Sequence, residues 1–293
     1  MTILITGSTG FVGQALLKKL ANLPLIATKL AAAADYLSND PSIETLIHLA
    51  ARVHIMNDSD PDPLNAFRQT NVNATLNLAR QAAAAGVKRF IFISSIKVNG
   101  ESTAANHPFQ ADDPCLPQDA YAISKHEAEL GLREIAANTT MEVVIIRPPL
   151  IYGPGVKANF AALIKAIQRG LPLPLGAIQN QRSLVGIDNL VDFISLCISH
   201  PNAANQTFLV SDGQDLSTPA LIRGIADAAG VKARLIPVPV WGLTLAGKLT
   251  GKSAAIERLS GNLQLDISKA QQLLGWTPPV SVTEGLRRAV QPN

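Results

Sequence analysis

The sequence predicts an α/β fold in which helices cover both faces of a doubly wound parallel sheet, with a smaller lobe formed mainly by the C-terminal part. Short, unbroken apolar runs alternate with helical patterns through the first half of the chain. Apolar runs without polar alternation are typical of parallel strands that helices cover on both sides. The 293 residues are 47% hydrophobic and 16% charged, so the chain can bury a large core.

The expected elements follow one another in a regular order. Strands are expected at 3–5, 25–27, 46–49, 90–93, 143–147, 183–187 and 207–210, and helices at 11–20, 65–85 and 120–137. Gly86 is expected to end the second of these helices. Only about fifteen residues, Leu30 to Glu44, follow the second strand, which is short for a complete β-α unit. We therefore expect the crossover helix there to be missing or replaced by a loop.

Charge and cysteine content argue against several classes of protein. The formal net charge is only +3, which favours neither nucleic acid nor a membrane surface as a partner. Cys115 and Cys197 lack metal-site spacing, so we expect no metal and two reduced thiols in a cytoplasmic protein. Residues 1–6 indicate a strand rather than a targeting segment, and prolines and a lysine interrupt the apolar stretch 235–249.

A glycine-rich turn joins the first expected strand to the first helix. The turn runs Gly7, Ser8, Thr9, Gly10, Phe11, Val12, Gly13. Gly7 permits the tight turn, Gly10 lets backbone approach a pyrophosphate, and Gly13 allows close packing of helix on strand. The helix N-terminus attracts the phosphates. The motif predicts a dinucleotide site, and a glycine turn without a ligand is the alternative.

The end of the second expected strand bears on which dinucleotide binds. Sites that bind NAD place an acidic residue there, about twenty residues after the turn, to hold the ribose 2′-hydroxyl. Here the strand ends with Ala27, Thr28 and Lys29. Lys29 suits a 2′-phosphate, which favours NADP(H) over NAD(H). The alternative is a solvated surface lysine without a role in binding.

Two further motifs carry groups suited to proton transfer. Tyr121 and Lys125 are four residues apart and share one helix face. A nearby ammonium favours the phenolate, so we expect the pKa of Tyr121 to move down from its usual value of about 10 towards working pH. Ser94 and Ser95 end the strand 90–93, at the edge of the sheet where ligands bind. Each motif alone also occurs by chance.

Together, the glycine turn, the strand-end serines and Tyr-x-x-x-Lys resemble the extended short-chain dehydrogenase/reductase family, which has a Rossmann-type fold. The chain looks most similar to its NAD-dependent epimerase/dehydratase branch, close to UDP-N-acetylquinovosamine-type 4-reductases and UDP-glucose 4-epimerase-like proteins. Further landmarks of that branch lie at 48–51, 71–75, 95–100, 147–155, 265–269 and 274–278. The resemblance covers nearly the whole chain.

The resemblance implies roles for the matching residues. Tyr121 would exchange a proton with a sugar oxygen, Lys125 would hold the nicotinamide ribose and tune Tyr121, and Ser95 matches the catalytic serine better than Ser94. Residues 1–155 would form the dinucleotide-binding domain, to which segments near 183–211 return, and 156–293 would form mainly the substrate-binding lobe. The expected cofactor contacts are Gly7, Ser8, Thr9, Gly10, Phe11, Val12, Gly13, Lys29, Leu49, Ala50, Ala51, Tyr121, Lys125 and Pro148.

The resemblance also implies contacts to a nucleotide-sugar substrate. Arg182, six residues before Asp188, resembles the arginine that grips the diphosphate, and a guanidinium matches phosphate oxygens in pairs. Arg258 is the second expected clamp, although its spacing to the following motif departs from the relatives. The expected substrate contacts are Ser95, Lys97, Asn159, Arg182 and Arg258. The alternative for the arginines is a solvated surface charge.

One departure from the branch narrows the reaction. In 4,6-dehydratases an Asp-Glu pair follows the catalytic Ser or Thr, whereas Ile96 and Lys97 stand there in this chain. Elimination needs an acid and a base, so a dehydratase is disfavoured. The leading hypothesis is NAD(P)-dependent reduction of a UDP-4-keto-6-deoxy-N-acetylhexosamine at C4. The alternatives are a UDP-hexose 4-epimerase with tightly bound NAD and, in another class, a non-catalytic dinucleotide-binding regulator.

Two smaller expectations remain. His54 lies close enough in sequence to the third strand to reach the sugar, although an isolated histidine is more often structural. The helices expected at 65–85 and 120–137 resemble those that pair as a four-helix dimer interface in relatives, so a homodimer is expected.

Overall fold

A six-stranded parallel sheet organises the larger part of the molecule. The computed structural model describes residues 1–53, 62–251 and 253–291. In spatial order the strands are β2 (Leu25–Thr28), β1 (Thr2–Thr6), β3 (Ile43–His48), β4 (Arg89–Ile93), β5 (Glu142–Arg147) and β8 (Thr207–Leu209), and every neighbouring pair is parallel. The predicted doubly wound α/β fold is confirmed.

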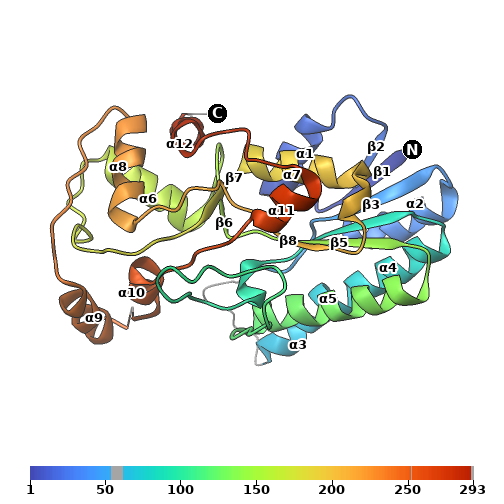
Figure 1. The fold of residues 1–293 in the computed structure, drawn as a ribbon, viewed down its shortest axis with the longest axis horizontal. Coiled ribbons are helices and arrows are strands. Elements are labelled where there is room, and N and C mark those ends of the chain that lie inside the picture. Colours follow the sequence, from blue (N-terminus) through green and yellow to red (C-terminus); the bar gives the residue numbers. More distant parts are fainter. Residues whose placement is uncertain (54–61, 252, 292–293) are drawn as a thin grey trace.

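Helices cover the two faces of this sheet and bury two separate apolar clusters. In Figure 1, α1 (Phe11–Lys19), α7 (Ile187–Ser199) and α11 (Ser268–Leu274) lie on one side of the strands. On the other side lie α2 (Ala33–Asn39), α4 (Ala74–Ala84) and α5 (Ala120–Asn138). The short helix α3 (Pro63–Phe67) and a π-helical turn (Arg68–Asn73) lead into α4. Because both faces are covered, the central residues of strands such as β1, β4 and β5 are apolar without alternation.

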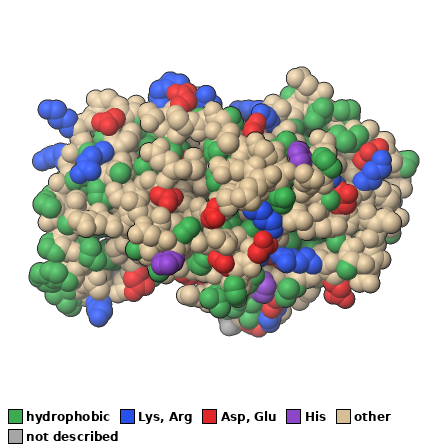
Figure 2. All heavy atoms as spheres, in the orientation of Figure 1, with side chains coloured by type: hydrophobic (Ala, Val, Ile, Leu, Met, Phe, Trp, Pro, Cys, Tyr) green, Lys and Arg blue, Asp and Glu red, His purple; other side chains and the backbone are tan. Residues whose placement is uncertain are grey.

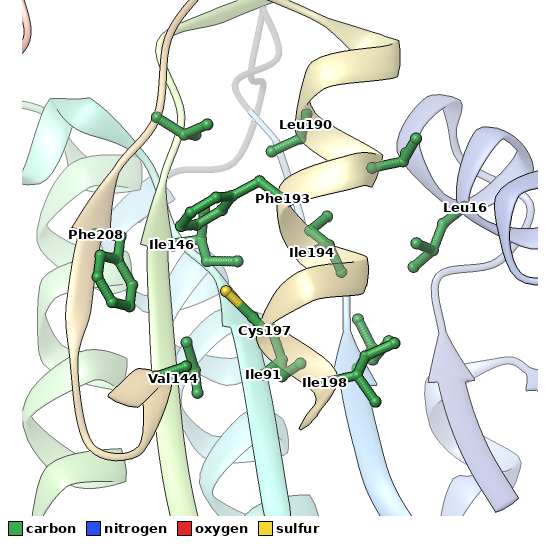
Figure 3. Packing of buried hydrophobic residues seen from close by; sticks show 14 of the residues in the cluster. Leu16, Ile91, Val144, Ile146, Leu190, Phe193, Ile194, Cys197, Ile198 and Phe208 are labelled. Carbon is green, nitrogen blue, oxygen red and sulfur yellow. The ribbon is translucent and has the colours of Figure 1, made fainter. Parts of the chain in front are cut away.

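The packing of α7 shows how the sequence pattern builds this core. Its apolar residues recur at the helical spacing i, i+3, i+4, i+7 and i+8, as Leu190, Phe193, Ile194, Cys197 and Ile198. Figure 3 shows these side chains against strand residues of the sheet, with Leu16 of α1 on the far side. Cys197 is fully buried there, where its small side chain packs as an apolar residue between α7 and the strands.

The short segment after β2 contains a helix after all. A 3-10 turn (Leu30–Ala32) leads directly into α2, which has seven residues. Our expectation that the crossover helix is missing is therefore wrong. Ala33 and Leu37 bury one side of α2 against the sheet, so two turns suffice. Strand β2 is the edge of the sheet. Helix α2 connects it to β3, which pairs with the other side of β1.

A second lobe lies at the end of Figure 1 away from the N-terminus. A small parallel sheet of β6 (Leu150–Tyr152) and β7 (Leu184–Gly186) borders it. Its core joins residues such as Tyr152, Phe160, Ile222 and Leu286 from several segments. Its helices are α6 (Ala158–Gln168), α8 (Thr218–Ala228), α9 (Val240–Leu249), α10 (Ser253–Ser260) and α12 (Val282–Val290). Of segment 183–211, α7 and β8 lie on the large sheet, whereas β7 pairs with β6.

The surface carries charges of both signs in close alternation. On the face in Figure 2, lysines and arginines are interspersed with aspartates and glutamates. Within the described ranges, no helix combines the length and hydropathy that crossing a bilayer requires. Among the same residues, no group of three or more His, Cys, Asp or Glu side chains is arranged to hold a metal ion.

Candidate active site

The carboxyl ends of the parallel strands bring the sequence motifs to one edge of the sheet, as expected for this topology. The amide of Leu49 donates to the carbonyl of Thr6 at 3.1 Å, which joins the ends of β3 and β1. The amide of Ser94 donates to the carbonyl of Ile146 at 2.7 Å, and the amide of Ile96 donates to that of Pro148 at 3.0 Å. The turns after β4 and β5 are therefore fixed against each other.

The glycine turn is packed too closely for side chains at two positions. Gly7 has φ +74°, and a Cβ there would lie 2.6 Å from the amide nitrogen of Ala50. A Cβ on Gly13 would lie 2.4 Å from the carbonyl oxygen of Gly7. At Gly10, by contrast, a Cβ would meet only that carbonyl, at 3.3 Å. The turn is closed against the β3 end and against α1, while Gly10 remains approachable.

The residues at this turn fit a dinucleotide. Gly10 is the N-cap of α1, and Phe11 begins the helix. The first amides of a helix lack carbonyl partners within it and point out of its end, which suits an anionic pyrophosphate. Lys29 is exposed directly after β2, where it precedes the 3-10 turn. Lys29 thus follows the edge strand β2, at the position where NAD-binding sites carry an acidic residue.

The two strand-end serines point to different partners. The hydroxyl of Ser95 accepts from the amide of Lys97 at 3.3 Å, and Ser95 acts on the phenol of Tyr121 in the direction that lowers its pKa. The hydroxyl of Ser94 is buried and donates to Glu129 Oε1 at 2.5 Å. The structure therefore brings Ser95, and not Ser94, together with Tyr121.

The phenol of Tyr121 stays neutral at working pH. Burial raises its pKa to about 12, the charge of Asp119 acts in the same direction, and the hydrogen bond with Ser95 opposes them. Our expectation of a lowered pKa is therefore wrong. Removing a phenolate from water costs more here than the hydrogen-bonding effect of Ser95 returns. A neutral phenol is equipped to donate a proton.

Lys125 lies one helical turn after Tyr121 and is 1% exposed. Its ammonium lies 3.9 Å from the centre of the Phe92 ring, a favourable position for a cation. Burial lowers the pKa of Lys125 to about 7, and the charge of Glu129 opposes that shift. His48 is kept neutral nearby, because burial and the charge of Lys125 lower its pKa to about 3.

Sequence reasoning missed Asn71 as a part of this site. The π-helical turn places its side chain so that it accepts from the amide of Arg52 at 2.8 Å and donates to the hydroxyl of Ser124 at 3.0 Å. Ser124 in turn donates to the carbonyl of Tyr121 at 2.7 Å. Asn71 thus links the segment after β3 to the first turn of α5. The signal available in the sequence was the family landmark at 71–75, which we did not translate into a role for Asn71 at the site.

Lys97 is engaged by carboxylates. Its ammonium lies 2.8 Å from Glu101 and 2.5 Å from Asp119. Burial acts to lower the pKa of Lys97, but the hydrogen bonds to Asp119 and Glu101 outweigh it, so the pKa is raised. Asp119 also caps α5 by accepting from the amide of Ala122 at 2.7 Å. Lys97 therefore supports the start of the helix that carries Tyr121.

The remaining expected substrate residues lie in the second lobe. Arg182 is partly buried and donates to the carbonyl of Gly261 at 3.0 Å. Burial lowers the pKa of Arg182, and the charge of Glu101 opposes this shift. Asn159 is exposed at the start of α6, and Arg258 is exposed on α10, where its Nε donates to the carbonyl of Ala254. His54 lies outside the described residues.

Comparison with known proteins identifies the family. The model of the NAD dependent epimerase/dehydratase family matches residues 3–211. The chain belongs to this family. It is an enzyme that depends on a nicotinamide dinucleotide, so the alternative of a non-catalytic regulator is set aside. The match spans the glycine turn, both strand-end serines and the Tyr-x-x-x-Lys motif.

Curated relatives within the family match the chain along nearly its whole length. A UDP-glucose 4-epimerase of Vibrio cholerae is 48% identical over 99% of this chain and 94% of its own length. A GDP-6-deoxy-D-mannose reductase of Pseudomonas aeruginosa is 26% identical over 97% of this chain and 94% of its own length.

Solved structures of the family share the fold. RMD from Pseudomonas aeruginosa in complex with NADPH superimposes with a TM-score of 0.78 at 24% identity, over 99% of this chain and 98% of its own. A Thermotoga maritima UDP-glucose 4-epimerase with UDP-glucose superimposes with a TM-score of 0.78 at 23% identity, over 99% and 97%.

Proposed function

We propose that this enzyme oxidises and reduces C4 of a nucleotide-activated hexose. The observation that carries the proposal is that Ser95, at the end of β4, acts on the pKa of the Tyr121 phenol, with Lys125 buried one helical turn further along α5. Relatives that act on nucleotide sugars, including the 48% identical UDP-glucose 4-epimerase, support this class of substrate.

The chain's own residues supply the proton chemistry. When the sugar is oxidised, Tyr121 as the phenolate would take the proton of the C4 hydroxyl, and when the keto sugar is reduced, Tyr121 as the phenol would return that proton to the C4 oxygen. Burial raises the pKa of Tyr121 to about 12, so the oxidation step needs a positive charge that favours the phenolate. Ser95 donates a hydrogen bond to the same oxygen and fixes its position. Lys125 presents an ammonium that favours the phenolate whenever Tyr121 has given up its proton. A bound nicotinamide ring supplies the hydride acceptor and donor.

Epimerisation is the reaction that we favour, and net reduction is the second candidate. The sequence alone favoured the reductase. The V. cholerae epimerase, at 48% identity over almost the entire chain, reverses that order. Reduction is retained because Lys29 stands where NAD-binding enzymes carry a carboxylate and because a GDP-6-deoxy-D-mannose reductase is also among the relatives.

Dinucleotide binding and substrate binding are assigned to different lobes. We propose that residues 1–155, together with α7 and β8, bind the dinucleotide, and that 156–293 bind mainly the substrate. Arg182, whose guanidinium donates to the carbonyl of Gly261, would grip the diphosphate. Lys29 favours NADP(H) as the cofactor, which agrees with the reductase candidate, whereas an epimerase would hold NAD. Titrating both dinucleotides tests this choice, and a clear preference for NAD would overturn it.

A homodimer through α4 and α5 is also proposed. Gly131 of α5 packs closely on Leu76 of α4, so the two helices form one continuous surface. Leu130 on α5 is 54% exposed, as expected of an apolar side chain that a second copy covers. Size-exclusion chromatography with light scattering should give twice the chain mass. In a Leu130→Glu variant the measured mass should move towards that of a single chain. A wild-type protein with the mass of a single chain would refute the dimer.

The reaction itself is tested with purified protein and defined sugars. UDP-glucose, UDP-N-acetylglucosamine and a UDP-4-keto-6-deoxy sugar are incubated separately with each dinucleotide, and products are identified by NMR. An epimerase converts the hexoses without net change in dinucleotide absorbance. A reductase consumes reduced dinucleotide only with the keto sugar. Absence of any change at C4 in all three would refute the proposed function.

A further inference from the structure

A buried ion pair lies directly behind the proposed catalytic residues. Glu129 on α5 and Arg147 at the end of β5 are each 1% exposed. The Glu129 carboxylate accepts from Arg147 Nε at 2.9 Å and from Nη2 at 2.5 Å. Replacing buried ion pairs by apolar residues is often neutral or stabilising. Stability alone is therefore a weak reason for such a pair, and its position relative to the site becomes the relevant question.

The pair contacts the segments that carry the site. Glu129 Oε1 also accepts from the hydroxyl of Ser94 at 2.5 Å, the residue immediately before Ser95. Arg147 donates to Asn99 Oδ1 at 2.9 Å and to Cys115 Sγ at 3.3 Å, in the chain between Ser95 and α5. One buried pair thus fixes the end of β4 and the connection that leads from it to α5.

Glu129 is also placed to act on Lys125. The two are four residues apart on one face of α5, and Tyr121 lies one further turn towards the N-terminus. Lys125 is buried, so little water is available to stabilise its charge. The charge of Glu129 works against the lowering of the Lys125 pKa by burial.

We propose that Glu129 is a positioning residue, which clamps the strand end bearing Ser95 to helix α5 and serves as the counter-charge of Lys125. The inference rests on the proposed function, because it presumes that Ser95, Tyr121 and Lys125 act on one sugar carbon. Glu129 itself touches neither that carbon nor the dinucleotide in this account.

The other charged and titratable groups around the two residues can be named. On the Lys125 side they are Tyr121 on the same helix and neutral His48 on β3. On the Glu129 side they are Arg147 on β5 and Arg133 on α5, the latter at 3.7 Å, with Cys115 beyond Arg147. Without the carboxylate of Glu129, the charged groups that remain around Lys125 are Arg147 and Arg133, which are both positive. Lys125 should then lose its proton more easily.

The first test needs no sugar substrate. Glu129→Gln keeps the shape of the side chain and removes its charge, and Glu134→Gln makes the same change at an exposed position of α5. Dinucleotide affinity is measured by calorimetry between pH 6 and 9. Dinucleotide affinity should fall as the pH rises, because Lys125, the expected contact of the nicotinamide ribose, loses its proton. We expect the pH at which this fall begins to move down by about one unit in Glu129→Gln and to stay unchanged in Glu134→Gln. Superimposable curves for wild type and Glu129→Gln would overturn the counter-charge role.

The second test separates the clamp from the charge. Ser94→Ala removes one hydrogen bond to the Glu129 carboxylate, which should lower kcat by about tenfold to a hundredfold with KM nearly unchanged. Glu129→Asp keeps the charge on a shorter stem, so it should restore the pH profile of binding while kcat stays low. A Ser94→Ala enzyme with kcat within twofold of wild type would overturn the clamp. A protein that converts no nucleotide sugar would refute the proposed function instead, and the binding curves would still decide the role of Glu129.

Discussion

Replacing Lys125 by methionine should stabilise the protein at neutral pH, by an amount that shrinks as the pH rises. Lys125 is 1% exposed, and burial lowers its pKa from 10.5 to about 7. Below pH 7 the folded protein must hold a buried ammonium that the unfolded chain exposes to water. This penalty is complete below the folded pKa and is relieved as the pH rises from there towards the unfolded value.

The size of the effect follows from the two pKa values. Between them, each pH unit changes the free energy of unfolding by about 1.4 kcal/mol. With a folded pKa of about 7, the wild type should gain about 2 kcal/mol from Lys125 between pH 7 and 9. Methionine keeps an unbranched stem without the charge. The Lys125→Met variant should therefore lack this gain and exceed the wild type most at pH 7.

The assay is urea unfolding of wild type, Lys125→Met and Lys88→Met at pH 7, 8 and 9. The Lys88 side chain is 71% exposed, so its replacement controls for the loss of a lysine as such. Titrating groups that do not interact with Lys125 cancel in the difference between wild type and variant. Parallel stability curves for wild type and Lys125→Met would refute the reasoning, because they would mean that Lys125 titrates alike in the folded and unfolded states.

Three further predictions concern the site. Tyr121→Phe should lower turnover by about 10²- to 10⁴-fold while dinucleotide affinity measured by calorimetry stays within a few-fold; a near-normal rate would remove Tyr121 from the mechanism. Gly13→Ala would bring a Cβ to 2.4 Å from the Gly7 carbonyl, and should cost about 1–3 kcal/mol in urea unfolding, whereas unchanged stability would contradict the close packing. Arg182→Ala should raise KM for the nucleotide sugar by about ten- to a hundredfold with kcat little affected, and an unchanged KM would argue against a diphosphate contact.

The large sheet could be predicted because its strands are buried on both faces. Runs such as 3–5 and 90–93 are apolar at every residue, and their shortness and alternation with helical segments indicate parallel strands covered on both faces. The strand β6 was missed because it has three residues, of which Leu150 is 47% exposed. Helix α2 was misjudged for a similar reason, since seven residues with two buried positions leave no periodic signal.

The site divides in the same way. Ser95, Tyr121 and Lys125 stand in motifs whose spacing is local, so their elements could be named from the sequence. The contact of Glu129 with Arg147 depends on where α5 crosses β5, and nothing local to either residue indicates it. The direction of the Tyr121 pKa was mistaken because it depends on burial, which the spacing of Tyr121 and Lys125 does not express.

The most direct test of the account follows deuterium at C4. UDP-glucose carrying deuterium at C4 is incubated with the enzyme and oxidised dinucleotide, and the C4 configuration and isotope content of the recovered sugar are read by NMR and mass spectrometry. The account predicts the C4 epimer with its deuterium still at C4, and loss of this product in Tyr121→Phe. An epimer formed at another carbon, or a C4 epimer in which solvent hydrogen has replaced the deuterium, would contradict redox chemistry at C4.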